Sequence, residues 1–167
     1  MGESSLERIT RTDLRRLARI AADEREDFFA RHAEWRLLYA HRLLCTALCG
    51  QSALHFCNGT AGIEEFDVWS YYAAHAEAAF PHHCHSYRDF GKSKFGRAMG
   101  RDTYVGRRIH LTGRSLSSRP GDDPVVSLQR YLRSGRTLSA RNLRRSALVL
   151  IEPESHLGYV AWPTLGS

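Results

Sequence analysis

The segment from Phe66 to Tyr72 carries the clearest secondary-structure signal in this chain of 167 residues. Its sequence, FDVWSYY, is rich in the aromatic and β-branched residues that favour strands, and it is short enough for a buried sheet. The apolar run over 36–50 is typical of either a buried strand or a buried helix. Within it, Leu43–Leu48 has the form of a buried strand that runs into a small-residue turn, Gly50-Gln51-Ser52.

Helical patterns alternate with these strands. Thr10 and Asp13 form a capping-box-like start for a helix over 10–32, and Asp123-Pro124 begins another that Gly135 ends. The apolar stripe of the first helix is Leu14, Leu17, Ala18, Ala21 and Phe28, and that of the second is Val125, Val126, Leu128, Tyr131 and Leu132.

The remaining chain gives shorter signals. We expect short helices at Ala53–Cys57 and Ser139–Arg145, strands at Arg107–Thr112, Ala147–Ile151 and Gly158–Trp162, and irregular structure over 78–101. The sequence has no internal repeat and no domain boundary. The alternation predicts one mixed α/β or α+β domain over 1–167, with an N-terminal helix at 10–32 and a core at 36–162.

Charge is divided unevenly along the chain. The net charge is +6, and 22 of the 24 basic residues are Arg. Residues 1–80 hold 9 Arg against 12 acidic residues, whereas residues 107–145 hold 10 Arg against 2 Asp. Because the guanidinium fork matches phosphate oxygens, a phosphorylated ligand or a nucleic acid is a candidate partner. Solvated surface charge is the alternative.

Cysteine content and hydropathy favour a cytoplasmic protein. The N-terminus has no apolar stretch typical of a signal peptide, and no run approaches the ~18 apolar residues of a membrane span. We therefore expect no membrane partner, and we expect the cysteines (Cys45, Cys49, Cys57 and Cys84) to be reduced thiols rather than disulfides.

An acidic pair opens the strand at Phe66–Tyr72. Glu65 and Asp67 lie two residues apart, so strand alternation puts both carboxylates on one face, a hard-oxygen site suited to Mg²⁺. The preceding turn supplies Gly50, which lets a phosphate approach the backbone, and Ser52, a hydroxyl at a helix start. The alternative is an exposed face of an edge strand.

This arrangement resembles the nucleotidyltransferase superfamily of the polymerase-beta type. The resemblance covers roughly residues 36–115. It implies an α+β fold with a small mixed sheet flanked by helices, and Mg²⁺-dependent transfer of a nucleotidyl group from a nucleoside triphosphate to an acceptor. It implies catalytic and metal-binding roles for Glu65 and Asp67, and phosphate-binding roles for Gly50 and Ser52.

The sequence departs from the family pattern in three places. Gln51 separates the glycine from the serine, the first carboxylate is Glu65 rather than Asp, and the third metal position is His110 rather than a carboxylate. A neutral imidazole does not supply the charge that two Mg²⁺ ions need. Two outcomes follow: the site works with a changed metal set, or the fold is kept and catalysis is lost.

A further basic segment lies at residues 89–97, where glycines, aromatic residues and cations alternate. Lys92, Lys94 and Arg97 are candidate phosphate contacts in a loop that closes on the ligand, and a plain surface loop is the alternative.

Two other classes of function stay open. The Arg-rich stretch suits a non-catalytic domain that binds RNA, DNA or a partner protein. A small zinc site built on His83, Cys84 and His85 is the third hypothesis, although adjacent residues rarely ligate one ion together.

Overall fold

The computed structural model describes residues 8–59, 63–82, 84–91 and 108–164. Within these residues the elements follow in the order α1 (Arg11–Arg31), α2 (Ala33–Tyr39), β1 (Leu43–Cys49), α3 (Gly50–Asn58), β2 (Glu65–Ala73), β3 (His85–Asp89), β4 (Arg108–Leu116), α4 (Pro124–Ser134), α5 (Leu138–Leu143), β5 (Leu148–Glu152), a 3-10 helix (Glu154–His156) and β6 (Val160–Trp162).

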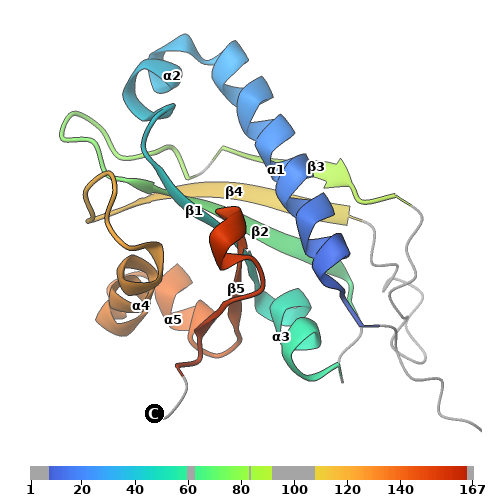
Figure 1. Cartoon of the computed structure of the whole chain (residues 1–167). Coiled ribbons are helices and arrows are strands. Elements are labelled where there is room, and N and C mark those ends of the chain that lie inside the picture. The colour runs from blue at the N-terminus through green and yellow to red at the C-terminus, as the bar shows by residue number, and fades with distance from the viewer. Residues whose placement is uncertain (1–7, 60–62, 83, 92–107, 165–167) are drawn as a thin grey trace, which may run out of the picture.

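The strands form one open six-stranded sheet in the order β3-β4-β2-β1-β5-β6. Neighbouring strands are antiparallel except β2 and β4, which are parallel. Helices flank the sheet on both sides, with α1 and α2 on one side and α4 and α5 on the other (Figure 1). The described chain is therefore a mixed α/β structure, as the alternation of helical and strand signals predicts, with mostly antiparallel pairing.

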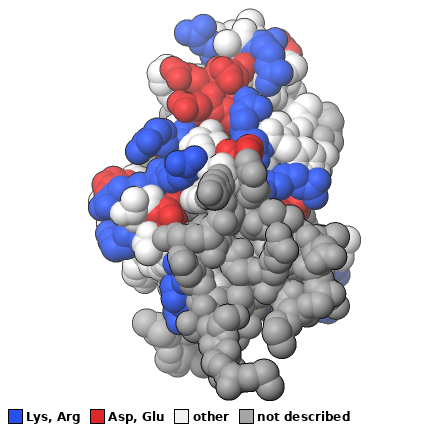
Figure 2. Space-filling model, turned by 90° about the vertical axis from the view of Figure 1, so that its right-hand side faces the viewer, with Lys and Arg blue, Asp and Glu red and all other residues white. Residues whose placement is uncertain are grey.

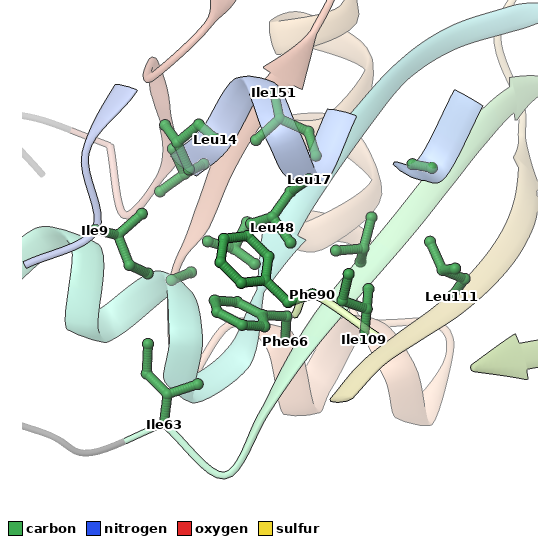
Figure 3. Packing of buried hydrophobic residues seen from close by; sticks show 14 of the residues in the cluster. Ile9, Leu14, Leu17, Leu48, Ile63, Phe66, Phe90, Ile109, Leu111 and Ile151 are labelled. Carbon is green, nitrogen blue, oxygen red and sulfur yellow. The ribbon is translucent and has the colours of Figure 1, made fainter. Parts of the chain in front are cut away.

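One side of the sheet, here called the α1 face, carries a large apolar core packed against α1. Figure 3 shows Leu14 and Leu17 of α1 lying over this face, with the rings of Phe66 and Phe90 side by side. The two ring centroids are 5.0 Å apart. The other buried members come from α1, α3, the strands β1, β2, β4 and β5, and residues that flank these elements: Ile9, Ala21, Leu48, Ala53, Ile63, Val68, Ile109, Leu111, Ala147, Val149, Ile151 and Leu157.

The opposite side, here called the α4 face, has a core over only part of its width. Leu128 and Leu132 of α4 and Leu143 of α5 pack there. They contact side chains of β1, the distal half of β2, β5 and β6, which include Cys45, Ala47, Cys49, Tyr71, Ala73, Leu148, Leu150 and Ala161.

A separate aromatic cluster joins α2 to the α1 face. Tyr72 of β2 stacks on Phe80 with centroids 4.4 Å apart, and Tyr39 meets both rings edge-on. A Cβ added at Gly113 of β4 would lie 2.3 Å from the Phe80 ring, so the cluster requires glycine at that position. This packing fixes β4 against the end of β2.

Ion pairs bind α1 to the sheet. Arg25 donates from Nη2 to Glu152 Oε2 at 3.0 Å, and the same guanidinium reaches the hydroxyls of Thr46 and Ser70 at 3.3 Å. Arg88 of β3 pairs with Asp27 of α1 at 3.1 Å. Figure 2, which looks onto the side that carries α1 and β3, shows acidic and basic side chains next to one another there.

Most sequence-predicted elements are confirmed. Helix α1 has the full Thr10–Asp13 capping box, and α4 runs from Pro124, capped by the Asp123 side chain, to the left-handed Gly135. The predicted strands at Phe66–Tyr72 and Ala147–Ile151 correspond to β2 and β5 within one or two residues.

The run over 36–50, for which strand and helix both stayed open, contains both. Helix α2 ends at Tyr39, and the strand predicted at Leu43–Leu48 is confirmed as β1. Three predictions need correction. Gly50-Gln51-Ser52 is the first turn of α3 rather than a separate turn. Part of the segment expected to be irregular is the strand β3, which forms because it pairs antiparallel with β4. Val126 is 51% exposed, since it lies outside the buried stripe of α4.

No helix among the described residues combines the length and apolar content needed to span a bilayer.

Candidate functional site

The acidic pair lies at the start of β2, on the part of the α4 face that α4 and α5 do not cover. Burial alternates along the strand, so Phe66 and Val68 are buried while Glu65 and Asp67 are half-buried. The two carboxylates therefore share one face, as strand alternation predicts. Asp67 pairs across the ladder with Cys49, the last residue of β1. The N-terminus of α3 consequently lies beside Asp67.

Gly50 supports this junction through its backbone conformation. Its φ is +65°, a left-handed value that side-chain-bearing residues rarely adopt. A Cβ added there would lie 3.7 Å from Asp67 Oδ2, which is ordinary contact distance. The conformation, rather than crowding, therefore requires glycine, and the Asp67 carboxylate lies directly beside the first backbone unit of α3.

Ser52 holds the junction together rather than facing a ligand. It is 1% exposed, and its hydroxyl donates to the Cys49 carbonyl at 2.9 Å. The same oxygen accepts from the Asp67 backbone N–H at 3.4 Å. The hydroxyl of Ser52, the predicted phosphate contact, therefore connects the end of β1 to β2. Through the Asp67 backbone N–H it helps to position Asp67.

Glu65 is paired within the protein. Arg108 of β4 donates to Glu65 Oε2 from Nη2 at 2.7 Å and from Nε at 2.9 Å. The register places the two residues opposite one another in the parallel β2–β4 ladder. A ligand that recruits the Glu65 carboxylate must displace this guanidinium or bind beside it.

His110 lies opposite Asp67 in the same ladder. Its Nδ1 is 3.9 Å from Asp67 Oδ1, and its Nε2 is 3.5 Å from the Thr112 hydroxyl. The position that the family resemblance implies for a third carboxylate is thus next to the acidic pair in space. The residue there is an imidazole.

Aromatic residues of β3 hold the His110 ring. Tyr87 stacks on it with centroids 4.8 Å apart, and His85 meets it edge-on at 5.0 Å. Arg108 also lies over the Tyr87 ring, at 4.8 Å from its centroid. The imidazole orientation is therefore set by the stacked Tyr87 ring on one flat side and by the edge-on His85 ring.

The electrostatics of Asp67 reflect its partial burial. Desolvation raises the pKa of this carboxyl above its ordinary value, and the Glu65 charge raises it further. The neighbouring His110 and the Trp69 indole N–H lower it, but burial is the largest cause. A cation bound beside this carboxyl would stabilise its ionised form, because an opposite charge offsets the cost of desolvation.

The donor set fits one Mg²⁺ ion better than two. Among the described residues no group of three or more His, Cys, Asp or Glu side chains is close enough to hold a metal. Mg²⁺ bound to a nucleotide, however, often takes only one or two protein carboxylates and completes its octahedron with phosphates and water. Asp67, with Glu65 beside it, meets that smaller requirement.

The other predicted candidates have separate outcomes. Lys92, Lys94 and Arg97 lie outside the described residues, as does His83 of the proposed zinc site. Within the described part of that segment, Cys84 and His85 join no metal-binding group. All four cysteines are free thiols, with Cys45 and Cys49 buried and Cys57 and Cys84 exposed.

Sequence reasoning missed Arg108, Tyr87 and His85 as neighbours of the acidic pair. All three are brought to the site by strand pairing. The sequence predicts irregular structure where β3 lies, whereas the register of β3 with β4 places Tyr87 next to His110. The run His-Ser-Tyr-Arg-Asp contains a single β-favouring residue, so propensity gave no warning.

Comparison of the chain with protein-family models, curated proteins and solved structures finds no match.

Proposed function

We propose that this protein is a nucleotidyltransferase-like protein that binds a nucleoside triphosphate with Mg²⁺ at Asp67 and transfers its nucleotidyl group to an acceptor. The observation that carries the proposal is the meeting of three segments, since Asp67 lies beside both the α3 N-terminus at Gly50 and His110. A carboxylate for a cation and helix N–H groups for phosphates lie together there.

Each residue has a part in this proposal. The first turn of α3 binds phosphate oxygens through its backbone N–H groups, and Ser52 keeps that turn against Asp67. Arg108, now on Glu65, is close enough to the acidic pair to neutralise phosphate charge. The bound Mg²⁺ supplies charge neutralisation at the triphosphate.

His110 takes the acceptor's proton in this proposal. Nδ1 faces Asp67, so Nε2, which lies 3.5 Å from the Thr112 hydroxyl, is the nitrogen that takes the proton. The acceptor oxygen loses its proton to His110 and bonds to the α-phosphorus, and the bond from that phosphorus to the bridging oxygen breaks. Pyrophosphate leaves, so bonds and charges balance with one metal ion.

The test is a thermal titration with ATP, GTP, CTP and UTP, each with and without Mg²⁺. We expect at least one triphosphate to raise the melting temperature in a Mg²⁺-dependent way, and Asp67→Asn to abolish the shift. Glu154→Gln, at an exposed carboxylate of the 3-10 helix, is the matched control and should keep it. If no triphosphate stabilises the wild type, the proposal is wrong.

A second candidate, a non-catalytic domain for RNA, DNA or a protein partner, rests on the surface of α4 and α5. Arg133, Arg141, Arg144 and Arg145 are exposed there, and none forms an ion pair with a described acidic residue. Salt-dependent binding to an RNA or DNA oligomer that Asp67→Asn leaves intact, and that neutralising Arg141, Arg144 and Arg145 abolishes, would select it.

A further inference from the structure

A pocket of about 270 Å³ lies away from the acidic pair, between the C-terminal end of β4 and helix α4. Its wall is formed by the end of β4 with the residues after it, by one side of α4, and by the loop to α5. The lining residues are Ser115, Leu116, Ser117, Ser118, Ser127, Arg130, Tyr131, Ser134, Arg136 and Thr137.

The lining has the chemistry of an anion site. It combines two Arg with seven hydroxyl-bearing residues, and no Asp or Glu is among the described residues that form it. Neither Arg130 nor Arg136 forms an ion pair with a described carboxylate. Guanidinium forks and hydroxyls are the donors that bind phosphate oxygens.

The Ser115 hydroxyl accepts from the Phe80 backbone N–H at 3.0 Å, and five of the other hydroxyls divide into two sets. Tyr131 and Thr137 hydrogen-bond to each other at 3.1 Å, and Ser134 donates to the Tyr131 carbonyl at 2.6 Å, so these shape the wall. Ser118 and Ser127 make no side-chain hydrogen bond to another described residue, although Ser127 is only 4% exposed. These two hydroxyls are available to a ligand that enters the pocket.

A third positive group lies behind the pocket. Arg114 of β4 stacks its guanidinium over the Tyr131 ring, 5.9 Å from the centroid. Its Nε is buried and has no hydrogen-bond partner among the described residues. An unpaired N–H of a cation inside the protein increases the preference of this region for an anion. Asp122 lines a neighbouring hollow together with Arg130 and is not part of the lining of this pocket.

We propose that this pocket binds the phosphate group of a small phosphate monoester, at a site separate from the one proposed for the triphosphate. At roughly 30 Å³ per water molecule the volume equals about nine waters, which suits a sugar phosphate better than a complete nucleoside triphosphate. Arg114 lies four positions after His110 on β4, a distance of about 13 Å along the strand, so the two sites do not overlap.

The experiment is calorimetric titration of the full chain with ribose 5-phosphate, with ribose as the neutral probe and inorganic phosphate as the minimal anion. We expect saturable binding of ribose 5-phosphate, weaker binding of phosphate and none of ribose. Arg130→Ala should weaken binding about tenfold or more, and Ser118→Ala by roughly two- to tenfold.

Matched variants separate the pocket from general electrostatics and from the proposed active site. Arg133→Ala removes an equal charge from α4 at a residue outside the pocket and should leave affinity unchanged. Asp67→Asn should also leave it unchanged, whatever that variant does to triphosphate binding. Absence of saturable binding would overturn the proposal, as would equal losses in Arg130→Ala and Arg133→Ala or stronger binding of an RNA lacking terminal phosphates.

Discussion

The two faces of the sheet are built from the same strands but are used differently. On the α1 face, helix α1 covers β1, β2 and β4, and buried side chains such as Phe66, Val68 and Ile109 form a large apolar cluster. On the α4 face, helices α4 and α5 cover β1 and β5 and the distal half of β2. The polar group around Asp67 and His110 occupies the part that the helices leave open.

This difference shows how a single strand serves both stability and chemistry. Along β2, Phe66 is fully buried while Asp67, its neighbour, is half-buried on the other side. The start of β2 is packed through its α1 face, so residues on the open half of the α4 face are free to be polar. The predictions below test this division, beginning with the largest expected effect.

Replacing Phe66 with Ala should cost about 3–5 kcal/mol of unfolding free energy, because it empties a buried site against Phe90. Asp67→Ala, one residue away, should cost less than about 1 kcal/mol, since its side chain is 33% exposed. Urea unfolding of both variants measures the contrast. Equal losses would show that the α4 face bears as much of the stability as the α1 face.

Arg25→Ala should cost about 2–4 kcal/mol, because the 14%-exposed guanidinium leaves Glu152 unpaired between α1 and the sheet. Its matched control is Arg15→Ala, which removes an exposed pair with Glu154 and should cost under about 1 kcal/mol. Thermal and urea unfolding compare them. A loss in Arg15→Ala as large as that in Arg25→Ala would contradict the view that burial gives the α1 contact its strength.

Gly50→Ala should cost about 1–2 kcal/mol, since alanine must adopt a φ near +65°. Gly121→Ala imposes comparable strain at φ +86°, in open space, and serves as the control. Only Gly50→Ala should weaken Mg²⁺-dependent triphosphate binding, because its methyl group would lie against Asp67 Oδ2. Binding lost in both variants would indicate general destabilisation rather than a site at Gly50.

The smallest effect concerns the pH dependence of Asp67. Burial raises the pKa of this carboxyl in the folded protein above the ordinary 3.8, so the folded state holds the proton more tightly than the unfolded chain. Ionisation therefore costs stability, and the cost develops as the pH rises from 3.8 through the raised pKa.

Asp67→Asn should accordingly raise the melting temperature at neutral pH by less than about 5 °C, and the gain should vanish at a pH below the ordinary value. Thermal melts over a pH series, with Glu154→Gln for comparison, provide the measurement. A gain that persists unchanged into acid would show that the Asp67 charge is not its cause.

The local signals in the sequence were sufficient for much of this fold. Thr10 and Asp13 mark the start of α1, and Asp123, Pro124 and Gly135 mark both ends of α4, because caps depend on neighbours in the chain. The common face of Glu65 and Asp67 follows from strand period alone. The register places His110 opposite Asp67, and the role that the resemblance implies for this position stays a prediction.

The parts that escaped prediction depend on distant partners. Nothing near Glu65 in the chain announces that Arg108 will pair with it, since a parallel ladder brings them together. The same holds for β3, whose sequence has little strand propensity and which pairs only with β4. The sequence pattern assigns the Ser52 hydroxyl to a ligand. Its burial and its hydrogen bonds to Cys49 and Asp67 are tertiary properties, so they cannot be read from neighbouring residues in the chain.

The sheet order has a kinetic consequence for the acidic site. Gly50, Ser52 and Asp67 belong to one contiguous unit, β1–α3–β2, whose antiparallel pairing closes a short stretch of chain. His110 reaches the site only when β4 pairs in parallel with β2, which requires a much longer loop to close. The pairing of β1 with β5 is also between strands far apart in the chain. Because long-range pairing is slow, a folding intermediate would hold the carboxylate and the helix N-terminus before it acquires the imidazole.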